Sequence, residues 1–151
     1  MKRAALFVSM SLGACTSTTD LSKHSMFQEQ IGVELSTRRD TYIYKFPHAR
    51  QSLWDHVYEF ATYDSAGNRV MHREPPKATC PTGSAITLSR VQRHQRFDNP
   101  NVIEALGTIR CDDSDLEFRY VWGIYPTIHP APWESADRKS PDRRTVAPDG
   151  T

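Results

Sequence analysis

The residue with the most specific chemical setting in this sequence is Cys15, whose thiol can carry a covalent group. Two small residues, Gly13 and Ala14, precede it and leave the scissile peptide bond open to a narrow protease site. Further upstream a basic pair at positions 2–3 is followed by an apolar stretch over 4–12. That stretch has about nine residues, which suits a secretion signal and is far below the roughly 20 needed to span a bilayer. We therefore expect a secretion signal at this end of the chain.

The run Leu12-Gly13-Ala14-Cys15 resembles the lipobox of bacterial lipoproteins, in which an aliphatic residue and two small residues precede a cysteine. The resemblance implies cleavage between Ala14 and Cys15, so that residues 1–14 are the signal peptide. It also implies a diacylglycerol thioether on Cys15 and an acyl chain such as palmitate on the new terminus, which together make a membrane anchor of several chains. Thr16 stands where an aspartate tends to retain Gram-negative lipoproteins at the inner membrane, so the resemblance implies the outer membrane, with the domain facing the periplasm. It covers about the first 15 residues only. A plain secretory signal, or a buried helix with a chance cysteine, is the alternative interpretation.

With Cys15 assigned to lipid, Cys80 and Cys111 remain as an even pair. A disulfide is the natural interpretation, because the periplasm is oxidising and closing a loop of about 30 residues stabilises a small domain by roughly 3–4 kcal/mol. Two buried free thiols, or half of a metal site, are the alternatives. Neither cysteine belongs to a Cys-x-x-Cys pair, so a redox-active site has little support.

The sequence offers no motif for catalysis, metal binding or a cofactor. The patterns Gly-x-Ser-x-Gly, His-Glu-x-x-His and Ser-x-x-Lys are absent, and no histidine pairs with another at helical ligand spacing. We therefore expect no catalytic residue, no metal and no cofactor. The formal net charge of the chain is +1, which makes nucleic acid a poor partner.

The densest basic cluster consists of Arg90, Arg93, His94 and Arg96. Such side chains bind phosphate and carboxylate groups of envelope polymers. On a strand, however, Arg90 and Arg93 point to opposite faces, so a solvated rim is the alternative to a single binding patch.

Aromatic residues near the end of the chain form a second possible interaction surface, since aromatic rings are enriched in interfaces. Tyr120 and Trp122 share a face of the last predicted strand, and packing in the core explains them equally well. Trp133 lies in a proline-rich segment with no obvious core to join. We expect it to anchor this segment to the domain or to a partner.

The hydrophobic patterning predicts a mainly β fold, a small antiparallel sheet or sandwich with at most one short helix. Structured chain begins at Ile31, and the clearest predicted strands lie at 41–46, 85–91, 102–111 and 116–124.

Residues 52–62 are ambiguous. A helix capped by Ser52 would give an α+β fold. Alternatively, a strand from Tyr58 leads into a hairpin turn with Gly67 at positive φ, which we favour for the later half, after a helical turn.

The length of 151 residues fits one domain. Composition divides the mature chain into a polar, lipidated tether over 15–30, a globular periplasmic domain over 31–125, and a proline-rich tail over 126–151 that we expect to be disordered.

These features favour a lipid-anchored envelope protein that acts as a non-catalytic accessory or interaction module, with envelope proteins or glycans as partners. Two alternatives remain. One is a periplasmic enzyme that acts on cell-wall or envelope material through a site without a linear motif. The other is a component of a secretion or conjugation apparatus, or an inhibitor of a foreign enzyme.

Overall fold

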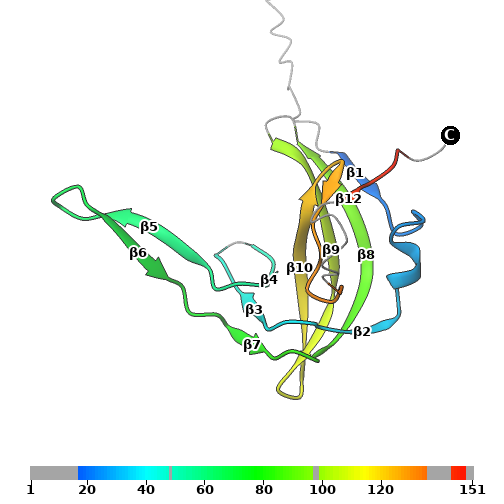
Figure 1. Ribbon diagram of the computed structural model, residues 1–151, viewed down its shortest axis with the longest axis horizontal. Helices are drawn as coiled ribbons and strands as arrows, with labels where there is room; N and C mark the ends of the chain where they lie inside the picture. Colours follow the sequence, from blue (N-terminus) through cyan, green and yellow to red (C-terminus); the bar gives the residue numbers. More distant parts are fainter. Residues whose placement is uncertain (1–16, 48, 97–98, 136–143, 149–151) are drawn as a thin grey trace, which may run out of the picture.

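Three long antiparallel strands form the centre of the fold (Figure 1): β8 (Ala85–Arg96), β9 (Asn99–Cys111) and β10 (Ser114–Ile124). The computed structural model describes residues 17–47, 49–96, 99–135 and 144–148. A tight turn joins β9 to β10 through Asp112 and Asp113, whose φ angles are 47° and 64°. Aspartate tolerates this left-handed conformation, and a turn of this hand matches the twist of the two strands. The sequence predicts this hairpin, and the structure confirms it.

Shorter strands extend the central hairpins into a mixed sheet of ten strands. The main path runs β1-β8-β9-β10-β4-β3-β7, and β4 lies parallel to β10 while the other strand pairs are antiparallel. The path includes β1 (Ser17–Asp20), β3 (Thr41–Tyr44), β4 (Ser52–Trp54) and β7 (Ala78–Cys80). Off this path, β2 (Glu34–Ser36) pairs with β8, and β11 (Thr127–Ile128) joins β10 to β12 (Arg144–Thr145). The fold is therefore mainly β, as the sequence predicts.

Residues 52–62 contain no helix. Ser52–Trp54 is strand β4, a bend follows at Asp55 and His56, and the chain then enters β5 (Glu59–Tyr63). The α+β alternative and the expected helical turn are both wrong, because β4 obtains backbone partners from β3 and β10 that the local sequence cannot reveal. In the described parts of the chain the one helix is a short 3-10 turn, η1 (Gln28–Gln30).

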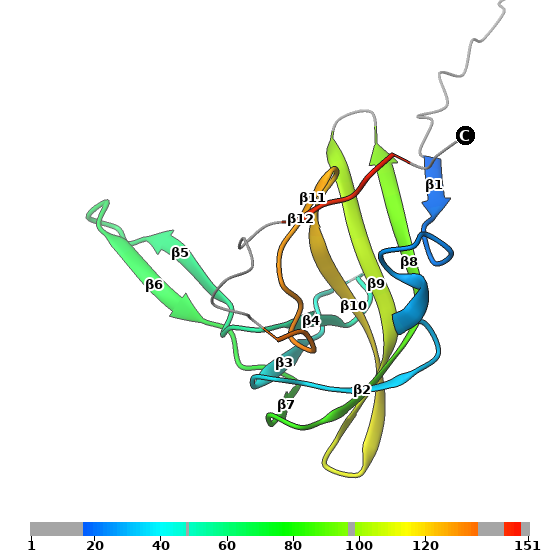
Figure 2. The same cartoon turned by 45° about the vertical axis from the view of Figure 1, so that its right-hand side comes forward.

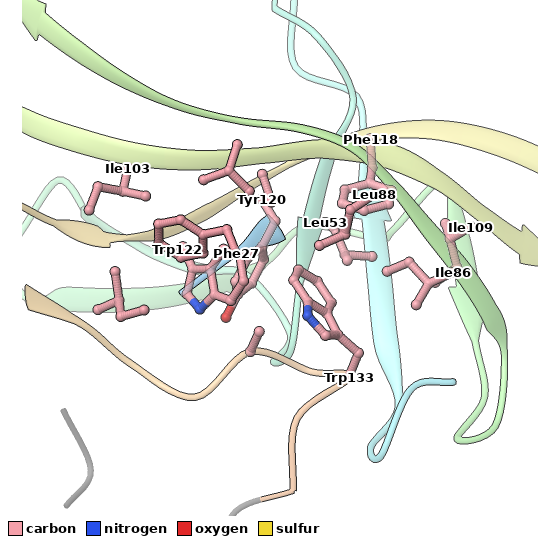
Figure 3. Packing of buried hydrophobic residues seen from close by; sticks show 14 of the residues in the cluster. Phe27, Leu53, Ile86, Leu88, Ile103, Ile109, Phe118, Tyr120, Trp122 and Trp133 are labelled. Carbon is pink, nitrogen blue, oxygen red and sulfur yellow. The ribbon is translucent and has the colours of Figure 1, made fainter. Parts of the chain in front are cut away.

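The hydrophobic core lies on one face of the central strands (Figure 3). Phe118, Tyr120 and Trp122 alternate along β10 and are all buried, whereas Val121 between them is 46% exposed. This period of two is the pattern expected of a strand with one covered face.

Residues 17–30 belong to the domain, so the boundary expected for the tether is wrong for these residues. β1 pairs with β8 from Ser17 onward, and the backbone N–H of Leu21 donates to the Val91 carbonyl at 2.8 Å. The side chain of Phe27 is fully buried, and its ring lies 5.0 Å from that of Trp122. The segment looks like a linker by composition because its only large apolar residues are Leu21, Met26 and Phe27, and the rest are polar or small.

The described part of the expected tail, 126–135 and 144–148, is also folded and runs back over the sheet (Figure 2). Its backbone carbonyls at Pro130 and Pro132 accept hydrogen bonds from the Arg39 side chain and the Arg38 backbone, both at 2.7 Å. Trp133 is only 6% exposed. The proline content here reflects an irregular but packed segment, and the expectation of disorder is wrong for these residues.

Cys80 and Cys111 form the disulfide that the sequence predicts, with Cα atoms 4.9 Å apart. Cys80 ends β7 at one edge of the sheet, and Cys111 ends β9 at its centre. Both side chains are buried in the core, so the bond ties the edge formed by β3 and β7 to the long central strands.

Candidate functional site

The hairpin formed by β5 and β6 (Arg69–Arg73) projects away from the main sheet and forms a separate two-stranded sheet (Figures 1 and 2). We call residues 59–73 the arm. Every residue of the two strands is exposed, including Tyr63, at 73%, and Met71, at 51%. A two-stranded hairpin is marginally stable in water because neither face is covered. The arm therefore contributes little to the stability of the rest of the domain and exposes a large part of its own surface to solvent.

The turn of the arm is well ordered by its own hydrogen bonds. The Asp64 carboxylate accepts from the backbone N–H groups of Ala66 and Asn68 at 2.9 and 2.8 Å. Gly67 has a φ of 82°, which a residue without a Cβ adopts most easily. Hydrogen bonds from Asn68 lower the pKa of the Asp64 carboxyl below its usual value. These contacts confirm the predicted hairpin and hold its shape in the absence of a covering layer.

The two faces of the arm differ in charge. Residues directly opposite each other share a face, so Phe60 and His72 lie on one face together with Thr62 and Val70. The Phe60 and His72 rings stack with their centroids 5.3 Å apart. We call the face formed by these four strand residues the strip face, and none of the four is Asp, Glu, Lys or Arg. The other face carries the Glu59 to Arg73 ion pair, Arg69 and Met71.

The strip face continues into a row of aromatic rings at the base of the arm. Tyr58 lies 6.2 Å from Phe60 and 5.2 Å from Trp54, measured between ring centroids. The Tyr58 backbone N–H donates to the hydroxyl of the buried Tyr44 at 2.9 Å. The arm is thus joined to the body through packed rings, which restrict its movement relative to the sheet.

A second polar region lies on the outer face of the main sheet, opposite the core. Glu104 of β9 is nearly buried there, with a side-chain exposure of 9%. Its carboxylate lies 3.1 Å from His94 Nε2 and 3.4 Å from Arg119 Nη1. Thr18 Oγ1 is 3.0 Å from His94 Nδ1. This chain of hydroxyl, imidazole and carboxylate ties β1 to the outer face and satisfies the buried charge.

A groove of about 530 Å³ lies on the same outer face, beside the loop that connects β3 to β4. Lys45 and Arg50 of the loop line one side, and Thr108 and Glu117, which face each other across β9 and β10, line the other. Leu106 contributes an apolar surface. The polar groups of Thr18, His94 and Glu104 do not line this groove, so the two polar regions of the outer face are distinct.

The predicted basic cluster does not form one patch. Arg90 faces outward opposite Leu106 and lies 3.8 Å from the Asp20 carboxylate, whereas Arg93 stands opposite the buried Ile103. The guanidinium of Arg93 lies 4.7 Å from the centre of the Tyr125 ring, a cation–π contact. Arg96 ends β8, and its side chain lies outside the described residues.

The structure places both predicted tryptophans in the core, so they do not form an exposed contact surface. Trp122 is fully buried, and Trp133 packs against it with ring centroids 5.2 Å apart. Trp133 Nε1 donates to Gln30 Oε1 at 2.9 Å. Of the two roles predicted for Trp133, the structure shows an anchor of the tail on the domain.

The described residues contain no group of three or more His, Cys, Asp or Glu side chains placed to hold a metal ion.

Burial raises the pKa of the Tyr120 hydroxyl, and the Asp55 carboxylate raises it further. Tyr120 therefore remains a neutral phenol, and its hydroxyl lies 3.0 Å from His129 Nε2. Over the described residues no helix is long and apolar enough to cross a bilayer. Cys15 and the preceding signal lie outside the described residues.

Neither the arm nor the groove can be recognised as a candidate site from the amino-acid sequence. The hairpin at 58–72 can be predicted from the sequence, but the pattern of its residues does not reveal that no other part of the domain covers either face. Lys45 and Arg50 flank a proline-containing loop and meet Glu117 only through the pairing of β4 with β10.

No family model, curated protein or solved structure matches this chain.

Proposed function

We propose that this protein is a lipid-anchored envelope protein of the outer membrane that acts in the periplasm as a non-catalytic interaction module. The observation that carries the proposed activity is the arm, a hairpin whose strand residues are all exposed and which stands off the main sheet. The proposed location rests on the residues before and including Cys15 and on their resemblance to a lipobox. The disulfide is consistent with an oxidising compartment.

The chemistry of the strip face indicates a protein partner. Phe60 and Val70 are each 37% exposed and adjoin an aromatic row that is anchored on the body. A nucleic acid or an anionic glycan would require cationic side chains, which this face lacks. An apolar protein surface suits the strip face, because such contact removes exposed aromatic area from water. It also covers one face of a two-stranded sheet that is only marginally stable by itself.

The lipid anchor has a direct test. We expect mass spectrometry of the mature protein from its own cells to show a terminus at Cys15 that carries a diacylglycerol thioether and an additional acyl chain. A Cys15→Ser variant should lack both lipids and should leave the membrane fraction, because the Cys15 sulfur is the atom to which the diacylglycerol is attached. A mature terminus at another residue, or an unmodified Cys15, would contradict the proposed anchor.

The arm is tested by site-specific photo-crosslinking in the native envelope. A photoreactive residue in place of Val70 should give one discrete protein adduct, whereas the same residue in place of Val121, which is similarly exposed on the main sheet, should not. Phe60→Ser in the Val70 background should reduce the adduct at least tenfold, because the neighbouring ring on the strip face is lost.

Folding of each variant is checked separately by the Cys80 to Cys111 linkage and by amide exchange of β8 to β10, which the arm does not support. Equal adducts at both positions, or an adduct that survives the loss of Phe60, would argue against the arm as a binding element. Adducts to lipid or glycan instead of protein would overturn the proposed partner class.

A further inference from the structure

The outer groove has the size and lining of a small-molecule site. Its volume of about 530 Å³ falls within the roughly 300–1,000 Å³ typical of ligand pockets. Two of the strand positions that line it, Thr108 and Glu117, are exposed and point away from the core, whereas a third, Phe118, has its side chain buried in the core. The groove therefore lies mainly on the face opposite the core, and none of its lining residues belongs to the arm.

Two cationic side chains of the loop between β3 and β4, Lys45 and Arg50, line the groove, and neither forms an ion pair with a described residue. The Lys45 ammonium donates to the Ala49 carbonyl at 2.8 Å, and the Arg50 guanidinium has no ion pair among the described residues. A third cation, Lys77, donates to Gln51 Oε1, and Gln51 itself lines the groove. Lys45 and Arg50, the two cations of the described lining, attract an anionic group, and the fork of Arg50 suits a carboxylate or phosphate.

The rest of the lining suits a ligand body that carries hydroxyl groups. Thr108 offers a hydroxyl, and the Glu117 carboxylate accepts hydrogen bonds from donors such as sugar hydroxyls. Gln51 is held in place because its Nε2 donates to the Glu117 carbonyl at 3.1 Å. Leu106 supplies an apolar surface against which the carbon face of a sugar ring can pack.

We infer that the groove binds an anionic saccharide, with its carboxylate or phosphate between Lys45 and Arg50 and its hydroxyl groups toward Thr108 and Glu117. A nucleotide fits less well, because the one aromatic residue of the described lining, Phe118, has its ring in the core and offers no stacking surface. This inference uses residues outside the arm and does not depend on the proposed partner protein.

Isothermal titration of the oxidised full chain with trigalacturonate, which carries carboxylates, tests the inference. Neutral galactotriose is the matched ligand, and glucose 6-phosphate and inorganic phosphate separate a sugar phosphate from phosphate alone. We expect trigalacturonate or glucose 6-phosphate to bind at least tenfold more tightly than the neutral sugar. Amide shifts in the NMR spectrum should appear at Thr108 and Ser89, which also lines the groove.

The double variant Lys45→Gln/Arg50→Gln should weaken binding at least tenfold, since it removes both unpaired cations. Lys23→Gln, which removes an exposed charge near β1, should leave the affinity within twofold, as should Phe60→Ser on the arm. Equal binding of charged and neutral sugars, an equal loss in the Lys23 variant, tighter binding of AMP, or no binding of any probe at millimolar concentration would overturn the inference.

Discussion

Replacing Trp133 with alanine is expected to lower the free energy of unfolding by about 3–5 kcal/mol, the usual cost of deleting a buried tryptophan. The side chain packs on Tyr120 and Trp122 with centroid distances of 5.3 and 5.2 Å, so its removal leaves a large cavity in the core. The hydrogen bond from Nε1 to Gln30 also disappears and leaves a partly buried amide oxygen without a partner. Chemical denaturation, monitored by fluorescence of the remaining tryptophans, measures this loss.

Two variants separate the contributions to this effect. Gln30→Ala should cost about 1 kcal/mol, because it removes the hydrogen bond and leaves the ring packing in place. Val121→Ala, on the exposed face of the same sheet, should change the stability by less than about 0.5 kcal/mol. A loss below about 1 kcal/mol for Trp133→Ala would mean that the segment 126–135 detaches easily and is not a true part of the core.

Removing the disulfide is expected to cost about 3–4 kcal/mol on the chain-entropy model, since it frees a loop with a sequence separation of 31 residues. The double variant Cys80→Ala/Cys111→Ala avoids the reactivity of a single free thiol. It should unfold at a lower denaturant concentration than the oxidised protein and close to that of the reduced protein. Thr79→Ala is the matched control, because Thr79 neighbours Cys80 on β7 but is exposed.

Peptide mapping without reductant should recover Cys80 and Cys111 in one linked species. Oxidised and reduced protein that unfold at the same denaturant concentration would show that the bond adds nothing to stability. Because Cys80 lies on an edge strand, we expect the loss to be greatest for β3 and β7, whose amide protons should exchange faster than those of β8 and β9.

The central strands could be predicted because their evidence is local. Leu116 to Ile124 alternates between apolar and polar residues, and the acidic run before it provides the turn. The disulfide followed from counting cysteines, and the hairpin of the arm from Gly67 and its neighbours. Each of these features depends on residues that are close in sequence or on chemistry that admits few alternatives.

Features that depend on distant partners could not be predicted. Phe27 and its neighbour Met26 are the two apolar residues of a polar stretch over 22–30, and Phe27 packs on Trp122, 95 positions later along the chain. β4 has three residues and exists because β3 and β10 flank it. The groove combines a loop and two strands in the same way, so none of its residues forms a motif.

The pairing of β1 with β8 determines how a membrane-anchored form of this protein would stand on its support. Ser17 is already in register with Gln95, so a lipid on Cys15 would be joined to the sheet by two residues, which reach at most about 7 Å when extended. Such a short attachment would keep the domain close to the membrane surface and would allow it to move through only a small volume around its anchor. Its reach is then set by its own length, and the arm occupies the end of the long axis away from β1 (Figure 1).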